Sequence, residues 1–270
     1  MIIIKASGEK ASFDLKKYQT SLSRAGLTMA EAKEIASAIN QDLYPGISSA
    51  EIYRKTNGWL KKNNRVVAAK YSLKRAIMAL GPSGFFFERY MAAVLQAYGY
   101  KTKVSQFLRG KCVEHEVDIV AERDGKKSMI ECKYHNTVGQ KSDVKVALYV
   151  QSRFLDLKDK QNFSSAVLIT NTLCTSEATQ YAKCVGLKII GWHYPMNGES
   201  LEHLIEDKKL YPITVLSSLK SQIATLLGRF NIVLISDILK YSTDDLARKT
   251  RLKPNLIKIL QQEAKNLINS

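Results

Sequence analysis

The chain has 270 residues, of which 45% are hydrophobic and 24% charged, and it carries a formal net charge of +16 at pH 7. This length suffices for a sizeable core, and two or three domains are expected. No stretch approaches the ~20 apolar residues that span a bilayer, and the first residues lack the long apolar region of a secretory signal peptide. We therefore expect a cytoplasmic protein with no membrane partner.

The positive charge is unevenly distributed. The net charge is +8 over residues 1–80, +3 over residues 81–210 and +5 over residues 211–270. Neutralisation of phosphates by basic side chains supplies the sequence-independent part of nucleic-acid affinity, so this distribution favours a nucleic acid as a partner of the flanking segments. A basic protein with no nucleic-acid partner is the alternative.

The first eighty residues predict a small α+β module. Ile2-Ile3-Ile4 and Ala11-Ser12-Phe13 flank Ser7-Gly8, a pattern typical of a short hairpin. Four helices are expected after it: one capped by Asp14, one opened by a Thr28/Glu31 capping box, one capped by Ser48 or Ser49, and one over about residues 65–80.

This segment resembles the ATP-cone, a small nucleotide-sensing domain found on ribonucleotide reductases and their transcriptional regulator. The resemblance rests on Ile3-Ile4-Lys5, Gly8, Phe13-Asp14, Lys17, Arg24-Ala25-Gly26-Leu27, Ala32, Ile35-Ala36, Ala50-Glu51-Ile52 and Ala69-x-Tyr71. It implies that ATP or dATP binds here as an effector, with Lys5, Gly8 and Lys17 as nucleotide-binding residues. Ala6 stands where the family has an arginine. A solvated face of lysines is the alternative.

A domain junction is expected at Gly81-Pro82-Ser83-Gly84, where chain breakers precede a serine that can cap the next helix. The segment that follows predicts the order helix, three strands, helix, strand, helix, strand. The expected elements are a helix over residues 84–95, strands over 100–104, 116–122 and 128–133, a helix over about 142–157, a strand over 166–170, a helix over about 175–185 and a strand over 188–192.

The most informative stretch is a predicted hairpin around an Asp124-Gly125 turn. Strand alternation puts Glu131 and Lys133 on one face, and Asp118 lies on the partner strand. Two carboxylates can hold a hard divalent cation that polarises a phosphate, and a lysine can orient the attacking water or stabilise phosphoryl oxygens. An ordinary charged surface hairpin is the alternative.

Glu88 is the one acidic residue in an apolar run that contains three phenylalanines. A carboxylate in such surroundings is costly unless it is paired or bound to a metal. If Glu88 faces inward, we expect it to meet Asp118 across the metal. If it faces outward, it is an ordinary surface residue.

Residues 81–195 resemble, in order and spacing, the PD-(D/E)xK restriction-endonuclease-like superfamily and its Mrr-type branch. The matching residues are Glu88, His115-Glu116-Val117-Asp118, Glu131-Cys132-Lys133, Ile169-Thr170-Asn171, Ala178-x-x-Tyr181-Ala182 and Gly186-x-x-Ile189-Ile190, with Val117 in place of the superfamily's proline. The resemblance implies a mixed β-sheet flanked by helices and an Mg²⁺- or Mn²⁺-dependent endodeoxyribonuclease. Asp118, Glu131 and Glu88 would bind the metal and, with Lys133, form the catalytic set.

Residues around this set are candidates for contact with DNA. Arg109 and Lys111 lie in a basic loop before the Asp118 strand, and His135 lies in a polar loop at the expected mouth of the site. Gln151 and Arg153, in the next predicted helix, are candidates to support the site.

The four cysteines are expected to be reduced thiols, because their spacing suggests no tight pairing. Cys112 with His115 and Cys132 with His135 have the spacing of zinc ligands, so a structural zinc site is an alternative. Cys132 and His135 are an odd number of positions apart on a probable strand, however, which favours a buried thiol.

The last sixty residues predict only helices, marked by Leu216 to Leu226, Ser236 to Leu239, a cap at Ser242 or Thr243, and a start at Lys253-Pro254. Short helices with small-residue turns in a basic context resemble tandem helix-hairpin-helix modules. These modules contact backbone phosphate through turn amides and helix N-termini, and Lys253 is the candidate DNA contact here. A helical packing or dimerisation tail is the alternative.

The sequence therefore predicts an α/β protein with three parts: an ATP-cone-like domain over residues 1–80, a restriction-endonuclease-like domain over 81–209 and an all-helical, DNA-contacting domain over 210–270. The function that we expect is metal-dependent DNA cleavage regulated by ATP or dATP. A nucleotide-sensing DNA-binding regulator with an inactive nuclease-like core is the alternative. One active site per chain suggests a homodimer or higher oligomer if both strands are cut.

Overall fold

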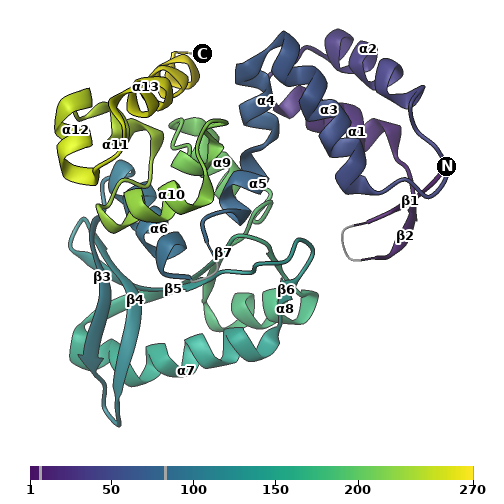
Figure 1. Cartoon of the computed structure of the whole chain (residues 1–270). Coiled ribbons are helices and arrows are strands. Elements are labelled where there is room, and N and C mark those ends of the chain that lie inside the picture. Colours follow the sequence, from purple (N-terminus) through teal and green to yellow (C-terminus); the bar gives the residue numbers. More distant parts are fainter. Residues whose placement is uncertain (6–7, 82–83, 270) are drawn as a thin grey trace.

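The computed structural model describes residues 1–5, 8–81 and 84–269. They form a mixed five-stranded sheet with helices on both faces and a separate group of helices at the N-terminal end (Figure 1). The α/β class expected from the sequence is therefore confirmed. Within these ranges, no helix has the length and apolar character needed to cross a bilayer.

The N-terminal segment forms the predicted hairpin and helices. β1 (Ile2–Ile4) pairs antiparallel with β2 (Lys10–Ser12), while residues 6–7 of the predicted turn lie outside the described residues. The helices described after it are α1 (Leu15–Arg24), α2 (Met29–Asn40), α3 (Ser49–Asn63), α4 (Arg65–Tyr71) and α5 (Leu73–Met78).

The first three of these helices begin at the predicted caps. The Asp14 carboxylate accepts the Lys17 N–H at 3.0 Å, and the Ser48 hydroxyl caps α3 in the same way. Thr28 and Glu31 form the reciprocal capping box. Each cap satisfies backbone donors that the first turn leaves unpaired, which stabilises a helix by about 1 kcal/mol.

The fourth predicted helix, over residues 65–80, is interrupted. It is divided at Ser72 into α4 and α5. The Ser72 hydroxyl donates to the Ala68 carbonyl at 2.7 Å and accepts from the Tyr53 hydroxyl at 2.6 Å. Serine hydroxyls that bond the preceding turn compete with regular helix geometry, and apolar periodicity alone does not reveal such a break.

The central sheet has the strand order β3-β4-β5-β7-β9. β3 (Lys101–Arg109), β4 (Glu114–Arg123) and β5 (Lys126–Lys133) are antiparallel neighbours, and β7 (Phe163–Thr170) and β9 (Lys188–Ile190) run parallel to β5. A second, two-stranded parallel pair, β6 (Lys141–Ser142) with β8 (Leu173–Cys174), was not predicted.

Two backbone features shape the sheet near the candidate site. The predicted turn is present, with φ of 53° at Asp124 and 72° at Gly125, the left-handed conformations that a tight hairpin requires. β3 is longer than the predicted segment and contains an irregularity at Ser105, with φ of 49°. The flanking pairs Val104–Ile119 and Gln106–Val117 put this irregularity opposite Asp118.

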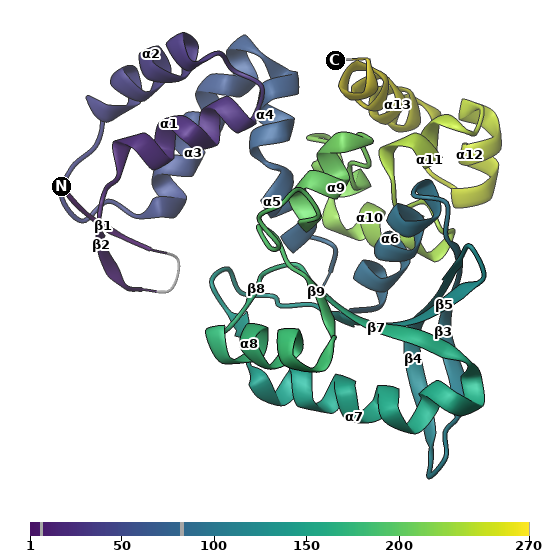
Figure 2. The same cartoon turned by 180° about the vertical axis from the view of Figure 1, so that it is seen from behind.

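Helices lie on both sides of the sheet, as Figure 2 shows from behind, and each side has its own apolar cluster. α6 (Gly84–Ala97) covers one face, where Phe87 and Met91 pack with Ile119 and Ile130. α7 (Val144–Gln161) and α8 (Ser176–Val185) cover the other face, where they pack against Val120, Met129 and Leu168.

The C-terminal helices pack on the outer side of α6 and share its core. They are α9 (Leu201–Asp207), the short 3-10 turn η1 (Ile213–Val215), α10 (Ser221–Arg229), α11 (Ile235–Leu239), α12 (Thr243–Thr250) and α13 (Pro254–Ile268). The helix predicted from Leu216 begins only at Ser221, so the predicted start of this helix was wrong. The turn between α12 and α13, which lacks the usual glycine, is made by Arg251 with φ of 58°.

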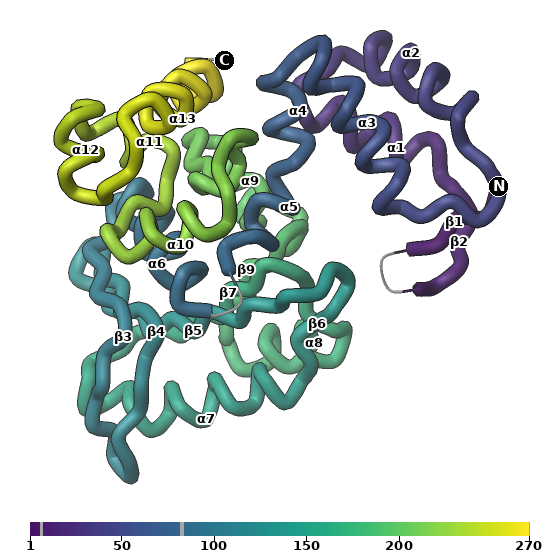
Figure 3. Tube along the Cα trace, viewed as in Figure 1, coloured from purple at the N-terminus to yellow at the C-terminus, as the bar shows by residue number. Residues whose placement is uncertain are grey.

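The N-terminal part joins the rest through α5. Helices α1–α4 form their own apolar cluster, whereas Leu73, Ala76 and Ile77 of α5 belong to the large core with α6 and the C-terminal helices. The tube in Figure 3 follows this connection from α4 through α5 toward the sheet. The predicted serine cap at the junction lies outside the described residues. The division into 1–80, 81–209 and 210–270 remains a prediction about folding units.

A glycine pair tests how tightly the C-terminal helices are joined to α6. A Cβ at Gly228 in α10 would lie 1.7 Å from Cε2 of Phe86 in α6. We expect Gly228→Ala to lower the free energy of unfolding by about 1–3 kcal/mol through overpacking. An added Cβ at Gly58 in α3 would have no atom within 4 Å, so Gly58→Ala should raise the free energy of unfolding by about 0.5–1 kcal/mol. Chemical denaturation measures both, and a stabilised Gly228→Ala would contradict the tight contact.

Candidate active site

Two acidic residues meet at one end of the β4–β5 hairpin. The register pairs Ile119 with Ile130, which brings Asp118 beside Glu131. The Cys132 N–H donates to Asp118 Oδ2 at 2.7 Å. This bond fixes the orientation of the Asp118 carboxylate at the point where the regular β4 pairing stops.

Glu88 contributes a third carboxylate from α6. Burial, together with repulsion from Asp118 and Glu116, raises its pKa to about 7, against a smaller opposing effect of Arg89. Glu88 is therefore partly buried and interacts electrostatically with the strand acids. Of the two orientations that the sequence left open, this is the inward one.

Glu131 is the most strongly engaged acid of the site. Only 17% of its side chain is exposed. Burial raises its pKa to about 7, and the charges of Asp118 and Glu88 act in the same direction, while Arg153 and Lys133 oppose the rise. Arg153 Nη1 donates to Glu131 Oε2 in a short ion pair.

Asp118 and Lys133 complete the predicted set. Burial also raises the pKa of Asp118, although the Cys132 N–H and the charges of Arg153 and Lys133 oppose this. Lys133 itself is exposed to solvent at the end of β5. Its charge acts on both strand carboxylates, and Glu88 interacts with both of them, so the four residues predicted for the catalytic set are electrostatically coupled.

Two further residues take part that sequence analysis did not assign to the site. Glu116 raises the pKa of both Glu88 and Asp118 and is exposed beside them. Arg153, named only as a supporting candidate, makes the direct ion pair with Glu131. The available signal for Glu116 was its position two residues before Asp118, on the same strand.

The donor set suits a hard divalent cation. Three carboxylates supply oxygen ligands of the kind that Mg²⁺ and Mn²⁺ prefer, and their pKa values are raised mainly by burial and then by the negative charges of neighbouring acids. In the described ranges, no three His, Cys, Asp or Glu side chains are arranged closely enough to hold a metal ion. Glu131 is held by Arg153 instead.

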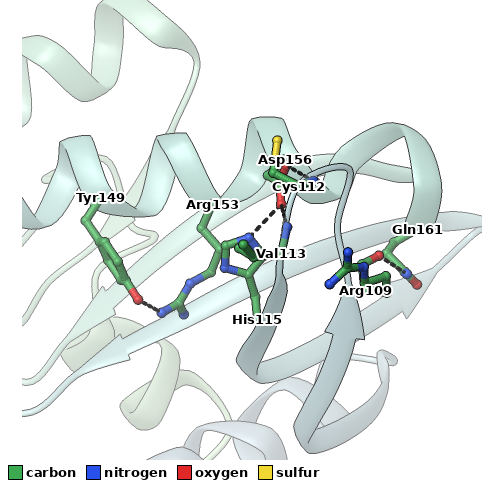
Figure 4. A network of polar contacts seen from close by, with 8 residues as sticks. All are labelled: Arg109, Cys112, Val113, His115, Tyr149, Arg153, Asp156 and Gln161. Carbon is green, nitrogen blue, oxygen red and sulfur yellow. Dashed lines mark hydrogen bonds and ion pairs between the residues drawn. The ribbon is translucent and has the colours of Figure 1, made fainter.

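The basic loop before β4 is fixed to α7, as Figure 4 shows. Asp156 Oδ1 accepts the Cys112 N–H at 2.8 Å, and Oδ2 lies 2.8 Å from His115 Nε2. These bonds hold the pKa of Asp156 well below its usual range. Arg109 and Lys111 flank this anchor, and both side chains are exposed.

The expectation for His135 needs correction. Its side chain is buried, and its Nε2 lies 2.9 Å from the Ser142 hydroxyl. The backbone N–H of His135 donates to Asn171 Oδ1 at 2.8 Å. The residue therefore holds the loop after β5 against β7 and does not lie at an open mouth. The zinc pattern is not assembled either, because Cys132 is buried and the described residues contain no cluster of metal ligands.

The remaining predicted contacts lie away from the carboxylates. Lys253 is exposed directly before α13. Lys5 and Gly8 lie at the β1–β2 hairpin, where Lys5 pairs with Glu9 at 3.1 Å, and Lys17 lies in the first turn of α1. Ala6, the position of the missing arginine, is outside the described residues.

Three parts of the chain match known families. Residues 1–79 match the ATP cone domain, residues 81–194 match Mrr_cat, described as restriction endonuclease, and residues 211–268 match the family described as AF1548-like, C-terminal.

Two relatives cover most of the chain. An "Uncharacterized protein" of Archaeoglobus fulgidus is 40% identical over 178 residues, which are 66% of this chain and 99% of that protein. The crystal structure of "Protein of Unknown Function AF1548" is 38% identical, has a TM-score of 0.62, and covers 69% of this chain and 99% of its own. The chain therefore belongs to the family of this A. fulgidus protein and joins an ATP cone to an Mrr-type restriction-endonuclease-like domain and an AF1548-like C-terminal region.

Proposed function

We propose that the chain is a divalent-metal-dependent DNA endonuclease controlled by ATP or dATP. The observation that carries this proposal is the electrostatic coupling of Glu88, Asp118 and Glu131, which come from one helix and two strands. Burial and mutual repulsion raise the pKa of Glu88 and Glu131 to about 7. Acids that only stabilise a fold are rarely gathered in this way, and perturbed carboxylates mark functional sites.

Each residue of the set has a proposed role. Asp118 and Glu131 hold Mg²⁺ or Mn²⁺, with Glu88 in support. The chemistry that a bound metal supplies is polarisation of the scissile phosphate and activation of the attacking water. Lys133 orients that water and stabilises negative charge on the phosphoryl oxygens. The Cys132 N–H keeps the Asp118 carboxylate in place throughout.

DNA is the proposed substrate, bound mainly through its backbone. Arg109 and Lys111 are exposed on a loop that Asp156 fixes, so phosphate contacts there cost little ordering entropy. Lys253 is the proposed contact of the C-terminal helices.

Since the chain carries one candidate site, cutting both strands requires two copies, and we propose a homodimer or a higher oligomer.

Nucleotide control is proposed to act through α5. Lys5, Gly8 and Lys17 are the proposed ATP or dATP contacts in the N-terminal domain. From there α4 leads into α5, where the Ala76 carbonyl accepts the Thr214 hydroxyl at 2.6 Å. The Met78 carbonyl at the end of α5 accepts the Tyr134 hydroxyl at 2.6 Å, and Tyr134 directly follows the proposed catalytic Lys133.

Cleavage of supercoiled plasmid tests the proposal. The wild-type protein should nick it with Mg²⁺ or Mn²⁺, and ATP should change the rate. Glu131→Gln should lower the cleavage rate by more than the ~100-fold that removal of an outer-sphere partner of a metal ligand costs. Glu122→Gln is the matched control, because Glu122 is an exposed acid on β4 away from the set. DNA binding without cleavage under either metal would favour a nucleotide-sensing regulator with an inactive core.

The raised pKa values predict how stability depends on pH. The folded protein binds protons at Glu88 and Glu131 up to a pKa of about 7, above the ordinary 4.5 of the unfolded chain. Stability should therefore fall as pH rises between these values and level off above about 7. Thermal unfolding should show Mg²⁺ raising Tm by roughly 2–4 °C more at about pH 8 than at about pH 5.5. An equal effect at both pH values would contradict metal binding by these acids.

A single hydroxyl tests the proposed route of nucleotide control. Tyr134→Phe removes the bond to Met78 and should reduce the ATP effect on cleavage by about half or more, while metal-dependent cleavage persists. Tyr98→Phe is the matched control, because the Tyr98 hydroxyl donates to the Leu204 carbonyl at 3.0 Å, away from α5. Equal ATP responses in both variants and the wild type would exclude this route.

A further inference from the structure

Arg153 links a buried carboxylate of the site to a tyrosine at the surface. Only 10% of its side chain is exposed, and Nη1 donates to Glu131 Oε2. Nη2 donates to the hydroxyl of Tyr149, one helical turn earlier on α7. The Tyr149 ring lies against the guanidinium, 4.5 Å from Cζ to the ring centre, and is itself 55% exposed. The tyrosine therefore separates the ion pair from solvent.

A carboxylate closer along the helix does not compete for Arg153. Asp156 lies three residues further along α7, but its oxygens accept the N–H groups of Cys112 and Val113 and lie against the His115 ring. Figure 4 shows Asp156 turned to the β3–β4 loop while Arg153 extends toward Tyr149. The guanidinium is thereby left for the carboxylate of the active site.

The guanidinium is not fully satisfied in this arrangement. Arg153 Nε is buried and has no hydrogen-bond partner among the described residues. A buried donor without a partner is costly, and arginine presents its donors in a planar fork that matches the oxygens of a phosphate. The unpaired Nε therefore points to a second arrangement in which an anion takes up these donors.

The charges of the site set up a competition for Glu131. A metal ion and a guanidinium are both cations, so they repel each other, and both need the same carboxylate oxygens. While Arg153 holds Oε2, the described acids do not form a three-ligand cluster. Metal binding through Oε2 of Glu131 therefore requires Arg153 to give up or loosen its hold.

We infer that Arg153 has two alternating partners: Glu131 when no metal is bound, and a phosphate of the DNA when the metal has replaced it on Glu131. Tyr149 holds the guanidinium beside the site in both arrangements. This inference rests on the proposed function and adds a substrate-binding residue that compensates the charge of the acids between turnovers and then clamps the substrate. A purely structural ion pair, by contrast, would have no role once the metal is bound.

Two variants of Arg153 separate the two roles. Arg153→Met removes the charge and keeps the length, so Glu131 loses its competing cation. We expect Mn²⁺ to bind about tenfold more tightly, as measured by titration calorimetry at about pH 8.5, where the acids are ionised. Cleavage at saturating Mn²⁺ should nevertheless fall by about tenfold or more, because the clamp is gone. A structural pair predicts that both quantities worsen together or stay unchanged.

Arg153→Lys keeps the charge but loses the planar fork. Its Mn²⁺ affinity should stay within about threefold of wild type, while cleavage still falls by about tenfold. This variant also tests the proposal if Arg153→Met does not fold, since full cleavage by Arg153→Lys would contradict the proposed contact of Arg153 with a DNA phosphate. Arg123→Met is the matched control: Arg123 lies 4.3 Å over the Tyr100 ring, donates to the Tyr98 carbonyl and pairs with Asp124, and it acts on none of the three site carboxylates. It should change neither quantity.

The outcomes for the wild-type protein keep this inference distinct from the proposed function. If the wild type neither binds Mn²⁺ nor cleaves DNA, the proposed function fails and the inference fails with it. If the wild type does both, but Arg153→Met binds Mn²⁺ no more tightly, only the inference is overturned. Tighter Mn²⁺ binding together with slower cleavage supports both.

Discussion

The structure depends on keeping several carboxylates together in a half-buried place. Asp118 raises the pKa of both Glu88 and Glu131, Glu88 raises that of Glu131, and Glu116 raises those of Glu88 and Asp118. Such a group is unfavourable unless positive charge and hydrogen-bond donors offset the repulsion. Arg153, Lys133 and the Cys132 N–H supply that compensation from within the chain, and the surrounding elements determine where each of them lies.

α6 shows how widely this constraint extends. It carries Glu88 on the side that faces the sheet, and its other side is fixed by the C-terminal helices. Arg89 Nη1 donates to the Gly228 carbonyl at 2.9 Å, and the buried Tyr90 hydroxyl donates to the Leu210 carbonyl at 2.8 Å. The position of one site carboxylate is therefore set partly by residues more than a hundred positions away. The C-terminal helices are part of the core that supports the site and are not a loosely attached tail.

The sequence predicts most of what is local and less of what depends on tertiary contacts. Turn residues, caps and strand alternation were enough for the β4–β5 hairpin, whereas the four residues of the proposed catalytic set came from the resemblance to the restriction-endonuclease-like superfamily. The break at Ser72 and the irregularity at Ser105 depend on side chains and strands that no local pattern contains. The burial of His135 depends on Asn171, which comes from another strand end. The pairing of Arg153 with Glu131 could not be predicted from the sequence either, because Asp156 is the nearer acid along the chain.

The contacts around β5 also constrain how an N-terminal signal could act. Tyr134 and His135 follow Lys133 directly, and both are tied to elements that reach α5: Tyr134 bonds the Met78 carbonyl, and the Asn171 side-chain amide bonds both the His135 carbonyl and Met78 Sδ. Asp118 and Glu131, by contrast, are held by bonds within the sheet and by α7. A displacement of α5 would therefore act first on the backbone that carries Lys133. Nucleotide control of this kind would change the orientation of the attacking water more than the affinity for the metal.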